Sequence, residues 1–153
     1  MTERIKIEQV EPAAYKAMFG LERYLAQCGL DKKLLCLIKV RASQINRCAF
    51  CIDMHTKEAK KAGETEQRLY ALNAWRETPS FTPQERATLT LTEALTSIAD
   101  NSISDELYDR LSRYFSQPEI AQILMAISTI NAWNRLAIAT RMIPGSYEIE
   151  KTV

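Results

Sequence analysis

The chain is poor in the residues that interrupt helices: its 153 residues include four glycines and five prolines, and most of these stand where a helix would begin or end. It has no internal repeat and no low-complexity segment, and no alternating pattern with hairpin turns predicts a strand. The sequence therefore predicts an all-α fold of about six or seven helices, in a single domain that spans residues 1–153.

The sequence also has little excess charge and no long apolar run. The net charge is +1, and no basic face of the kind that binds nucleic acid is evident. No apolar run approaches the length of a membrane span. Residues 1–10 mix charged side chains with isolated isoleucines, unlike a signal peptide or a lipidation signal. We therefore expect a cytoplasmic protein that binds neither nucleic acid nor a membrane.

Capping residues and apolar periodicity predict where the helices lie. Two capping boxes are the clearest starts, Thr82-Pro83-Gln84-Glu85 and Ser116-Gln117-Pro118-Glu119. The predicted helices cover about residues 13–28, 32–40, 47–63, 66–76, 83–98, 104–115 and 119–142. The last of these carries more apolar surface than a monomer of this size needs to cover, which predicts a homo-oligomer.

The chain has four cysteines and one histidine. In a reducing compartment such cysteines are catalytic, metal-binding or buried rather than structural disulfides. Cys28 and Cys36 are most simply core residues. His55 is the single imidazole, so an acid–base step near neutral pH that needs an imidazole has to use it.

Cys48, Cys51 and His55 form the most informative pattern. Offsets of three and seven residues place the three side chains on one face of a helix. Two thiols one turn apart can close a disulfide with little backbone movement. Cys48 lies at the predicted helix start, where free amides and the dipole favour a thiolate, and Arg47 adds a positive charge. His55 can take a thiol proton or return one to a leaving alkoxide.

Two other interpretations of this pattern stay open. The cysteines can be core residues, or a redox switch without catalytic activity. The pattern also supplies three zinc ligands, but a closed structural site needs four, and the fourth would have to be Cys28 or Cys36. Our preferred interpretation includes neither a metal nor a cofactor.

The residues around this pattern resemble the alkylhydroperoxidase D-like (AhpD-like) family of the carboxymuconolactone decarboxylase superfamily. The resemblance rests on residues 41–56, 63–68, 81–86, 92–96 and 130–135. It implies an all-helical fold, a homo-oligomer and reduction of organic hydroperoxides. One thiolate attacks the peroxide to form a sulfenic acid, and the other thiol condenses with it to form a disulfide. A dithiol donor, either a lipoylated protein or a thioredoxin-like one, then reduces the disulfide. Decarboxylases of the superfamily generally lack the cysteine pair, which argues against that activity.

The sequence departs from the family pattern at two positions. The family often has a relay glutamate twelve residues before the first cysteine, where this chain has Cys36, and Phe50 replaces a histidine between the cysteines. Without that carboxylate, we expect the imidazole of His55 to remain charged beside the sulfur. On this view Cys36→Glu should raise activity.

Four further residues are candidates for the proton relay or the pocket. Glu93, inside an otherwise apolar helix, either replaces the missing carboxylate or is an ordinary paired helix residue. Cys36 is either core or a third redox thiol. Trp133 and Asn131, with the neighbouring Asn134, either line the pocket or pack between helices.

Overall fold

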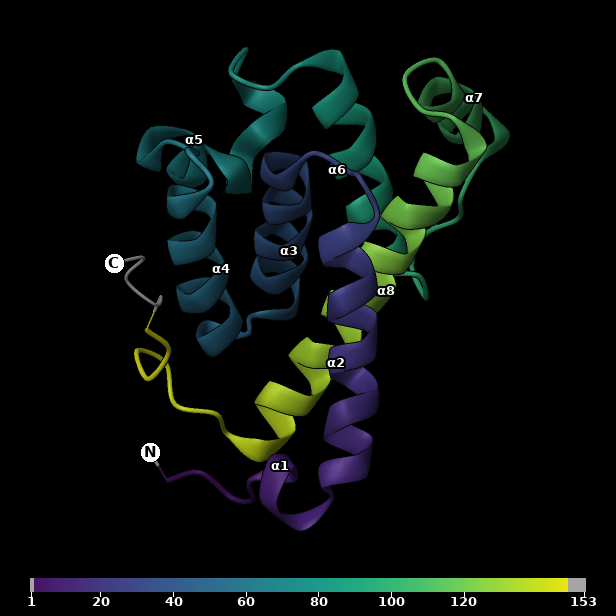
Figure 1. Cartoon of the computed structure of the whole chain (residues 1–153). Coiled ribbons are helices and arrows are strands. Elements are labelled where there is room, and N and C mark those ends of the chain that lie inside the picture. Colours follow the sequence, from purple (N-terminus) through teal and green to yellow (C-terminus); the bar gives the residue numbers. More distant parts are fainter. Residues whose placement is uncertain (1, 149–153) are drawn as a thin grey trace.

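The computed structural model describes residues 2–148 and, over that range, contains helices and loops but no strand. The elements are α1 (Ile7–Val10), α2 (Pro12–Gln27), α3 (Lys32–Asn46), α4 (Ala49–Lys61), α5 (Glu66–Ala71), the 3₁₀ helix η1 (Leu72–Glu77), α6 (Pro83–Thr96), α7 (Asp105–Ser112) and α8 (Gln117–Thr140). The all-α prediction is confirmed (Figure 1). Among these residues, no helix is both long and apolar enough to cross a membrane.

The helices outnumber the six or seven expected. The short α1 was not predicted, and the single helix expected over residues 66–76 is divided into α5 and η1. Ala74 has non-helical backbone angles, φ −119° and ψ 33°. The bend turns the carbonyl groups of Trp75 and Thr78 toward the guanidinium of Arg86, which donates to both at 3.0 and 2.9 Å. A tertiary contact therefore overrides the local helical preference here.

Helix α3 lies at the centre of the fold and packs against α4, α6 and α8. Its apolar residues point to two sides. Leu34 and Ile38 join the core cluster with α6, α7 and α8, whereas Leu37 and Val40 join a second cluster with α4, α5 and η1. Since α3 is apolar on both sides, it is buried between two layers and holds α4 in place against the rest of the molecule.

Most helix starts follow the caps seen in the sequence. Both predicted capping boxes are present, at Thr82 with Glu85 and at Ser116 with Glu119. Asp31 accepts a hydrogen bond from the amide of Leu34 at 2.9 Å. Each such cap stabilises its helix by about 1 kcal/mol. The sequence therefore placed these boundaries well because the caps act locally.

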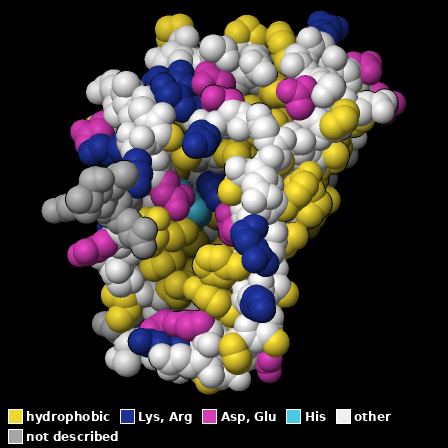
Figure 2. All heavy atoms as spheres, viewed as in Figure 1, with side chains coloured by type: hydrophobic (Ala, Val, Ile, Leu, Met, Phe, Trp, Pro, Cys, Tyr) yellow, Lys and Arg dark blue, Asp and Glu magenta, His cyan; other side chains and the backbone are white. Residues whose placement is uncertain are grey.

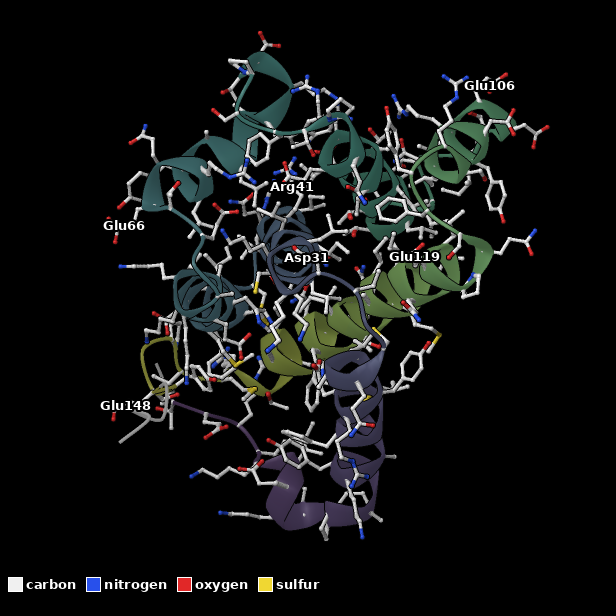
Figure 3. All side chains as sticks on the ribbon, turned by 45° about the horizontal axis from the view of Figure 1, so that its top comes forward. Asp31, Arg41, Glu66, Glu106, Glu119 and Glu148 are labelled. Carbon is white, nitrogen blue, oxygen red and sulfur yellow. A yellow bond between two sulfur atoms is a disulfide. The ribbon has the colours of Figure 1, made fainter. Side chains whose placement is uncertain are left out.

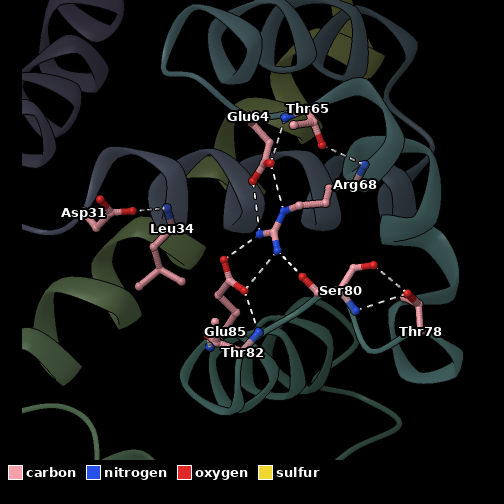
Figure 4. A network of polar contacts seen from close by, with 9 residues as sticks. All are labelled: Asp31, Leu34, Glu64, Thr65, Arg68, Thr78, Ser80, Thr82 and Glu85. Atoms are coloured by element: carbon pink, nitrogen blue, oxygen red, sulfur yellow. Dashed lines mark hydrogen bonds and ion pairs between the residues drawn. The ribbon is translucent and has the colours of Figure 1, made fainter.

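One polar cluster joins the loop after α4 to the start of α6 (Figure 4). The guanidinium of Arg68 donates to Glu64 at 2.9 and 3.2 Å and to Glu85 at 2.6 Å, and it lies 4.6 Å from the ring centroid of Phe81. Glu64 is buried, so its charge needs this partner. Two of the family-like motifs, residues 63–68 and 81–86, thus meet in space and serve the fold.

Candidate active site

The turn between α3 and α4 places the two cysteines. Arg47 ends α3 in the left-handed conformation, with φ 57° and ψ 37°. The amides of Arg47 and Cys48 donate back to the carbonyls of Gln44 and Ser43 at 3.2 and 3.0 Å. The chain then enters α4 with Cys48 as the N-cap residue. The side chain of Arg47 is exposed, so its structural role is to form this turn with its left-handed backbone.

A network of buried amides fastens this turn to α8. The side-chain nitrogen of Asn46 donates to the side-chain oxygens of Asn131 and Asn134 at 2.9 and 2.8 Å. Asn134 donates to the hydroxyl of Ser43 at 3.0 Å, and Asn131 donates to the hydroxyl of Thr96 at 3.0 Å. Of the two readings for Asn131 and Asn134, the structure therefore favours interhelical hydrogen bonds.

Cys48 and Cys51 are joined as a disulfide, with their Cα atoms 5.3 Å apart. Both are buried, at 1% and 2% exposure. The amide of Cys51 points at the sulfur of Cys48, with N and Sγ 3.4 Å apart. A thiolate at this helix start would be stabilised by that amide and by the helix dipole, which is the environment that the sequence predicted.

His55 follows Cys51 by one turn and is also buried, at 2% exposure. Its Nδ1 lies 2.7 Å from Oε2 of Glu58. Its Nε2 is buried and has no hydrogen-bond partner. With the carboxylate ionised, the proton of the first contact lies on Nδ1, and in the neutral imidazole the buried Nε2 then carries the lone pair.

Glu58 is the carboxylate that the sequence reasoning missed. Its other oxygen, Oε1, accepts a hydrogen bond from the hydroxyl of Tyr147 at 3.2 Å. Burial raises the pKa of Glu58, but the hydrogen bond and charge of His55, together with Lys39 and Tyr147, outweigh burial and hold the pKa below its ordinary value. The expectation that His55 lacks a carboxylate partner is therefore wrong. The signal was available, because Glu58 lies three residues after His55 on the same helical face.

Cys51, His55 and Glu58 line a cavity of about 350 Å³. Its other walls come from α2, α3, α4, α8 and the C-terminal segment: Tyr15, Phe19, Glu22, Lys39, Phe50, Met54, Trp133, Ala137, Met142 and Tyr147. Trp133 thus lies in the wall as the sequence suggested, with its ring edge-on to Tyr15 and Phe19 at 5.7 and 5.6 Å. In Figure 2, the cyan of the histidine side chain is visible in a recess, beside charged side chains and above hydrophobic ones.

Cys36 lies on the other side of Glu58. It lines a second, larger cavity of about 1010 Å³ that shares Lys39, Glu58 and Tyr147 with the first. Burial, and then the charge of Glu58, raise the pKa of the Cys36 thiol to about 11. At neutral pH this thiol stays protonated, which disfavours the reading of Cys36 as a third redox thiol.

Glu93 belongs to a different part of the molecule. Its carboxylate accepts hydrogen bonds from Arg41 at 2.8 Å, from the indole of Trp75 at 2.8 Å and from the guanidinium of Arg76. Figure 3 labels Arg41 near the middle of the molecule, where it joins α3 to α6. Glu93 does not contact His55 among the described interactions, because its oxygens are held by this cluster. Glu58 instead occupies the position suggested for Glu93.

The zinc interpretation required a fourth ligand from Cys28 or Cys36. Cys28 donates to the carbonyl of Leu25, and Cys36 faces the second cavity. Across residues 2–148, no three histidine, cysteine or acidic side chains are grouped as metal ligands would be.

Comparisons with known proteins agree with this architecture. The sequence profile of the carboxymuconolactone decarboxylase family matches residues 12–94. The uncharacterised protein YdfG of Bacillus subtilis is 42% identical over 139 residues, which cover 91% of this chain and 95% of YdfG. A protein of unknown function from Agrobacterium tumefaciens, suggested to be the antioxidant defence protein AhpD, superposes with a TM-score of 0.91 at 42% identity, over 95% of this chain and 100% of its own.

More distant structures share the fold alone. The debrominase Bmp8 superposes with a TM-score of 0.79 at 20% identity, over 88% of this chain and 73% of its own. The helical fold, the matched profile and the full-length relatives lead to one conclusion: the chain belongs to the carboxymuconolactone decarboxylase family and has its AhpD-like fold.

Proposed function

We propose that the protein is a thiol peroxidase that reduces organic hydroperoxides through Cys48 and Cys51, assisted by His55. The observation that carries this proposal is the position of Cys51, which is disulfide-bonded to Cys48 and faces the same cavity as His55. That arrangement brings together a reducible sulfur pair, a proton acceptor and a space for an organic molecule.

Cys51 is the attacking thiol in this proposal because it lines the cavity with His55, and Cys48, which is absent from the cavity lining, is the resolving one. The Cys51 thiolate takes the distal oxygen of ROOH and becomes a sulfenic acid, and the O–O bond breaks to release ROH after the alkoxide takes a proton. The Cys48 thiol then displaces water from the sulfenic acid and forms the disulfide. A dithiol donor supplies two electrons and two protons to restore both thiols.

His55 handles the protons in both directions. Its unpartnered Nε2 can accept the Cys51 proton and then deliver it to the leaving alkoxide. The apolar part of the cavity excludes water from the organic group of the substrate, and this favours an alkyl or aryl hydroperoxide over hydrogen peroxide.

Peroxide consumption by the reduced protein, measured with a panel of dithiol donors, tests the function. We expect turnover with a small dithiol, a lipoylated protein or a thioredoxin-like donor. Cys51→Ser should abolish turnover, while Cys48→Ser should still form one equivalent of sulfenic acid that a dimedone probe traps on Cys51. A disulfide that forms and breaks reversibly without turnover would instead indicate a redox switch.

The protein is further proposed to be a cytoplasmic homo-oligomer. Leu124, Met125 and Ile138 of α8 remain exposed at 37%, 38% and 48%, and burial in a subunit contact would remove this apolar area from water. Light scattering at micromolar concentration should give a multiple of the monomer mass. The monomer mass alone would contradict this part of the proposal.

A second candidate reaction is reductive removal of bromide from an aromatic ring. The aromatic walls from Tyr15, Phe19 and Trp133 favour a planar ligand, and a variant of Bmp8 has been solved with 2,3,4-tribromopyrrole. In this reaction two thiols become the disulfide, and the ring exchanges bromide for hydrogen. Bromide release from 2,3,4-tribromopyrrole, compared with consumption of cumene hydroperoxide, decides between the two reactions.

A further inference from the structure

We propose that Glu58, held by Tyr147 of the C-terminal segment, is the positioning carboxylate of His55, so that the relay carboxylate comes from α4 instead of from α3. The inference rests on the proposed function and names residues that the family pattern does not supply. It begins with the contact of 2.7 Å between Glu58 Oε2 and His55 Nδ1.

The carboxylate acts through the tautomer of the imidazole. An ionised Glu58 accepts a hydrogen bond from Nδ1–H, which leaves Nε2 as the proton acceptor in the buried site. Once Nε2 has taken the thiol proton, the same negative charge stabilises the imidazolium. Glu58 therefore positions and supports His55 and acts on the Cys51 sulfur only through the imidazole.

The residues at positions 36 and 58 line the same cavity from two different helices. Cys36 of α3 and Glu58 of α4 line one cavity, and the Glu58 charge is felt at the Cys36 sulfur. A glutamate at position 36 would bring a second negative charge against Glu58, and like charges at one site disfavour ionisation of both. The cysteine at position 36 is thus compatible with a carboxylate that has moved to position 58.

The C-terminal segment holds the carboxylate of Glu58 in place. The hydroxyl of Tyr147 donates to Glu58 Oε1 at 3.2 Å, and the carbonyl of Tyr147 accepts from Lys57 at 3.0 Å. The amide of Gly145 donates to Asp53 at 3.1 Å. Gly145 and Tyr147 therefore contact α4 at three of its residues, and Figure 1 shows this segment beside α4. The segment that contains Gly145 and Tyr147 is in this way part of the proposed catalytic arrangement.

The first test compares Glu58→Gln with a matched control, Glu93→Gln. Gln keeps a similar shape but cannot stabilise an imidazolium. We expect Glu58→Gln to slow oxidation of Cys51 by an organic hydroperoxide by about 10-fold to 100-fold, less than the loss of His55 itself. The control should react at the wild-type rate. Circular dichroism and a melting curve establish that both variants are folded.

The second test moves the carboxylate back to α3. In wild type, Cys36→Glu should lower the rate or leave it unchanged, because Glu58 is already present. In the Glu58→Gln background, Cys36→Glu should restore at least part of the lost rate. A purely structural role for Glu58 would not produce this rescue, so the inference is overturned by a wild-type rate in Glu58→Gln, or by a reduced rate that Cys36→Glu does not raise.

The third test does not depend on peroxidase activity. Because the chain has one histidine, its ¹⁵N spectrum contains a single imidazole. We expect signals of an Nδ1–H tautomer in the reduced wild-type protein, a mixture of tautomers in Glu58→Ala, and a smaller change in Tyr147→Phe. Unchanged signals in Glu58→Ala would contradict the positioning role. A wild-type protein that ignores hydroperoxides but shows the expected spectra would instead refute the proposed function alone.

Discussion

Glu58 and Glu93 are two partly buried carboxylates with opposite surroundings. Both have a pKa below the ordinary glutamate value: burial raises it in each case, but hydrogen bonds and nearby positive charge outweigh burial. Glu93 receives two guanidinium groups and an indole, which together satisfy both of its oxygens. Glu58 receives one imidazole and one phenol, and that imidazole keeps a free nitrogen.

The difference separates a structural carboxylate, Glu93, from the positioning carboxylate that we propose at Glu58. A carboxylate with several permanent cations neutralises charge that would otherwise be buried alone, and protein stability depends on it. A carboxylate hydrogen-bonded to an imidazole that faces a cavity leaves that imidazole able to exchange a proton. The sequence suggested Glu93 as a relay because its helix is otherwise apolar. In the structure, those apolar surroundings are the reason that the carboxylate needs cationic partners.

The largest effect should follow removal of the group that Glu58 serves. We expect His55→Ala to lower the rate of Cys51 oxidation by roughly 10²-fold or more, which is the scale of general acid–base assistance. Stopped-flow fluorescence with an organic hydroperoxide measures it. If His55→Ala reacts at the wild-type rate, His55 does not transfer the proton, and Glu58 then has no functional role that distinguishes it from Glu93.

Glu93→Gln should show the converse behaviour, a loss of stability without a loss of rate. The side chain of Arg41, at 13% exposure, would lose its anionic partner. We expect a decrease of about 1–3 kcal/mol in the free energy of unfolding, the range for leaving a buried donor without its partner. Urea unfolding of the reduced protein measures it. A slower reaction with hydroperoxide at unchanged stability would mean that Glu93, not Glu58, is the relay.

Acid should weaken the Glu93 region more than the Glu58 region. A depressed carboxyl pKa contributes stability above the unfolded value of about 4.5, and the contribution is lost as the pH falls through the folded pKa. Because Glu93 has more charged partners, Glu93→Gln should remove a larger part of the acid-induced loss than Glu58→Gln does. Unfolding free energies measured from about pH 7 to about pH 3 test this order.

The smallest effect is expected at Cys36, whose thiol pKa is raised by burial and by the charge of Glu58. Its raised pKa means that the unfolded state loses the thiol proton first, so stability should fall as the pH rises from 9.0 toward about 11. Cys36→Ala should remove this part of the alkaline loss. The thiol should also react slowly with iodoacetamide at about pH 8, compared with Cys51 in the reduced protein. Rapid alkylation of Cys36 would restore the reading of a third redox thiol.

Much of the fold could be predicted because its signals are local. The caps at Asp31, Thr82 and Ser116 act within one turn, and their helices begin within two residues of the predicted starts. The same is true of the spacing of Cys48, Cys51 and His55, since one helix defines their common face. The end of α8 was placed two residues late, at Met142 instead of Thr140, because Arg141 leaves the helix in the left-handed conformation.

The carboxylate partner was missed for a different reason. The family pattern directed attention to position 36, and the apolar helix directed it to Glu93. The local signal at Glu58 was one charged residue among several on α4, and helical spacing alone does not separate a relay from a solvated surface residue. Only burial of Nε2 and the contact of 2.7 Å distinguish Glu58 from its neighbours.

The sequence by itself determined the helical class, the main helix starts and the cysteine–histidine face, because each depends on residues within one or two turns. The contact of His55 with Glu58 is local as well, but tertiary structure decided that Nε2 is buried, what lines the cavity and where Tyr147 lies. The aromatic wall joins Tyr15 of α2 to Trp133 of α8, and Tyr147 reaches Glu58 across 89 positions of the chain. Contacts of that range depend on how α3 packs between two layers, and no local pattern encodes which distant side chains that packing brings together.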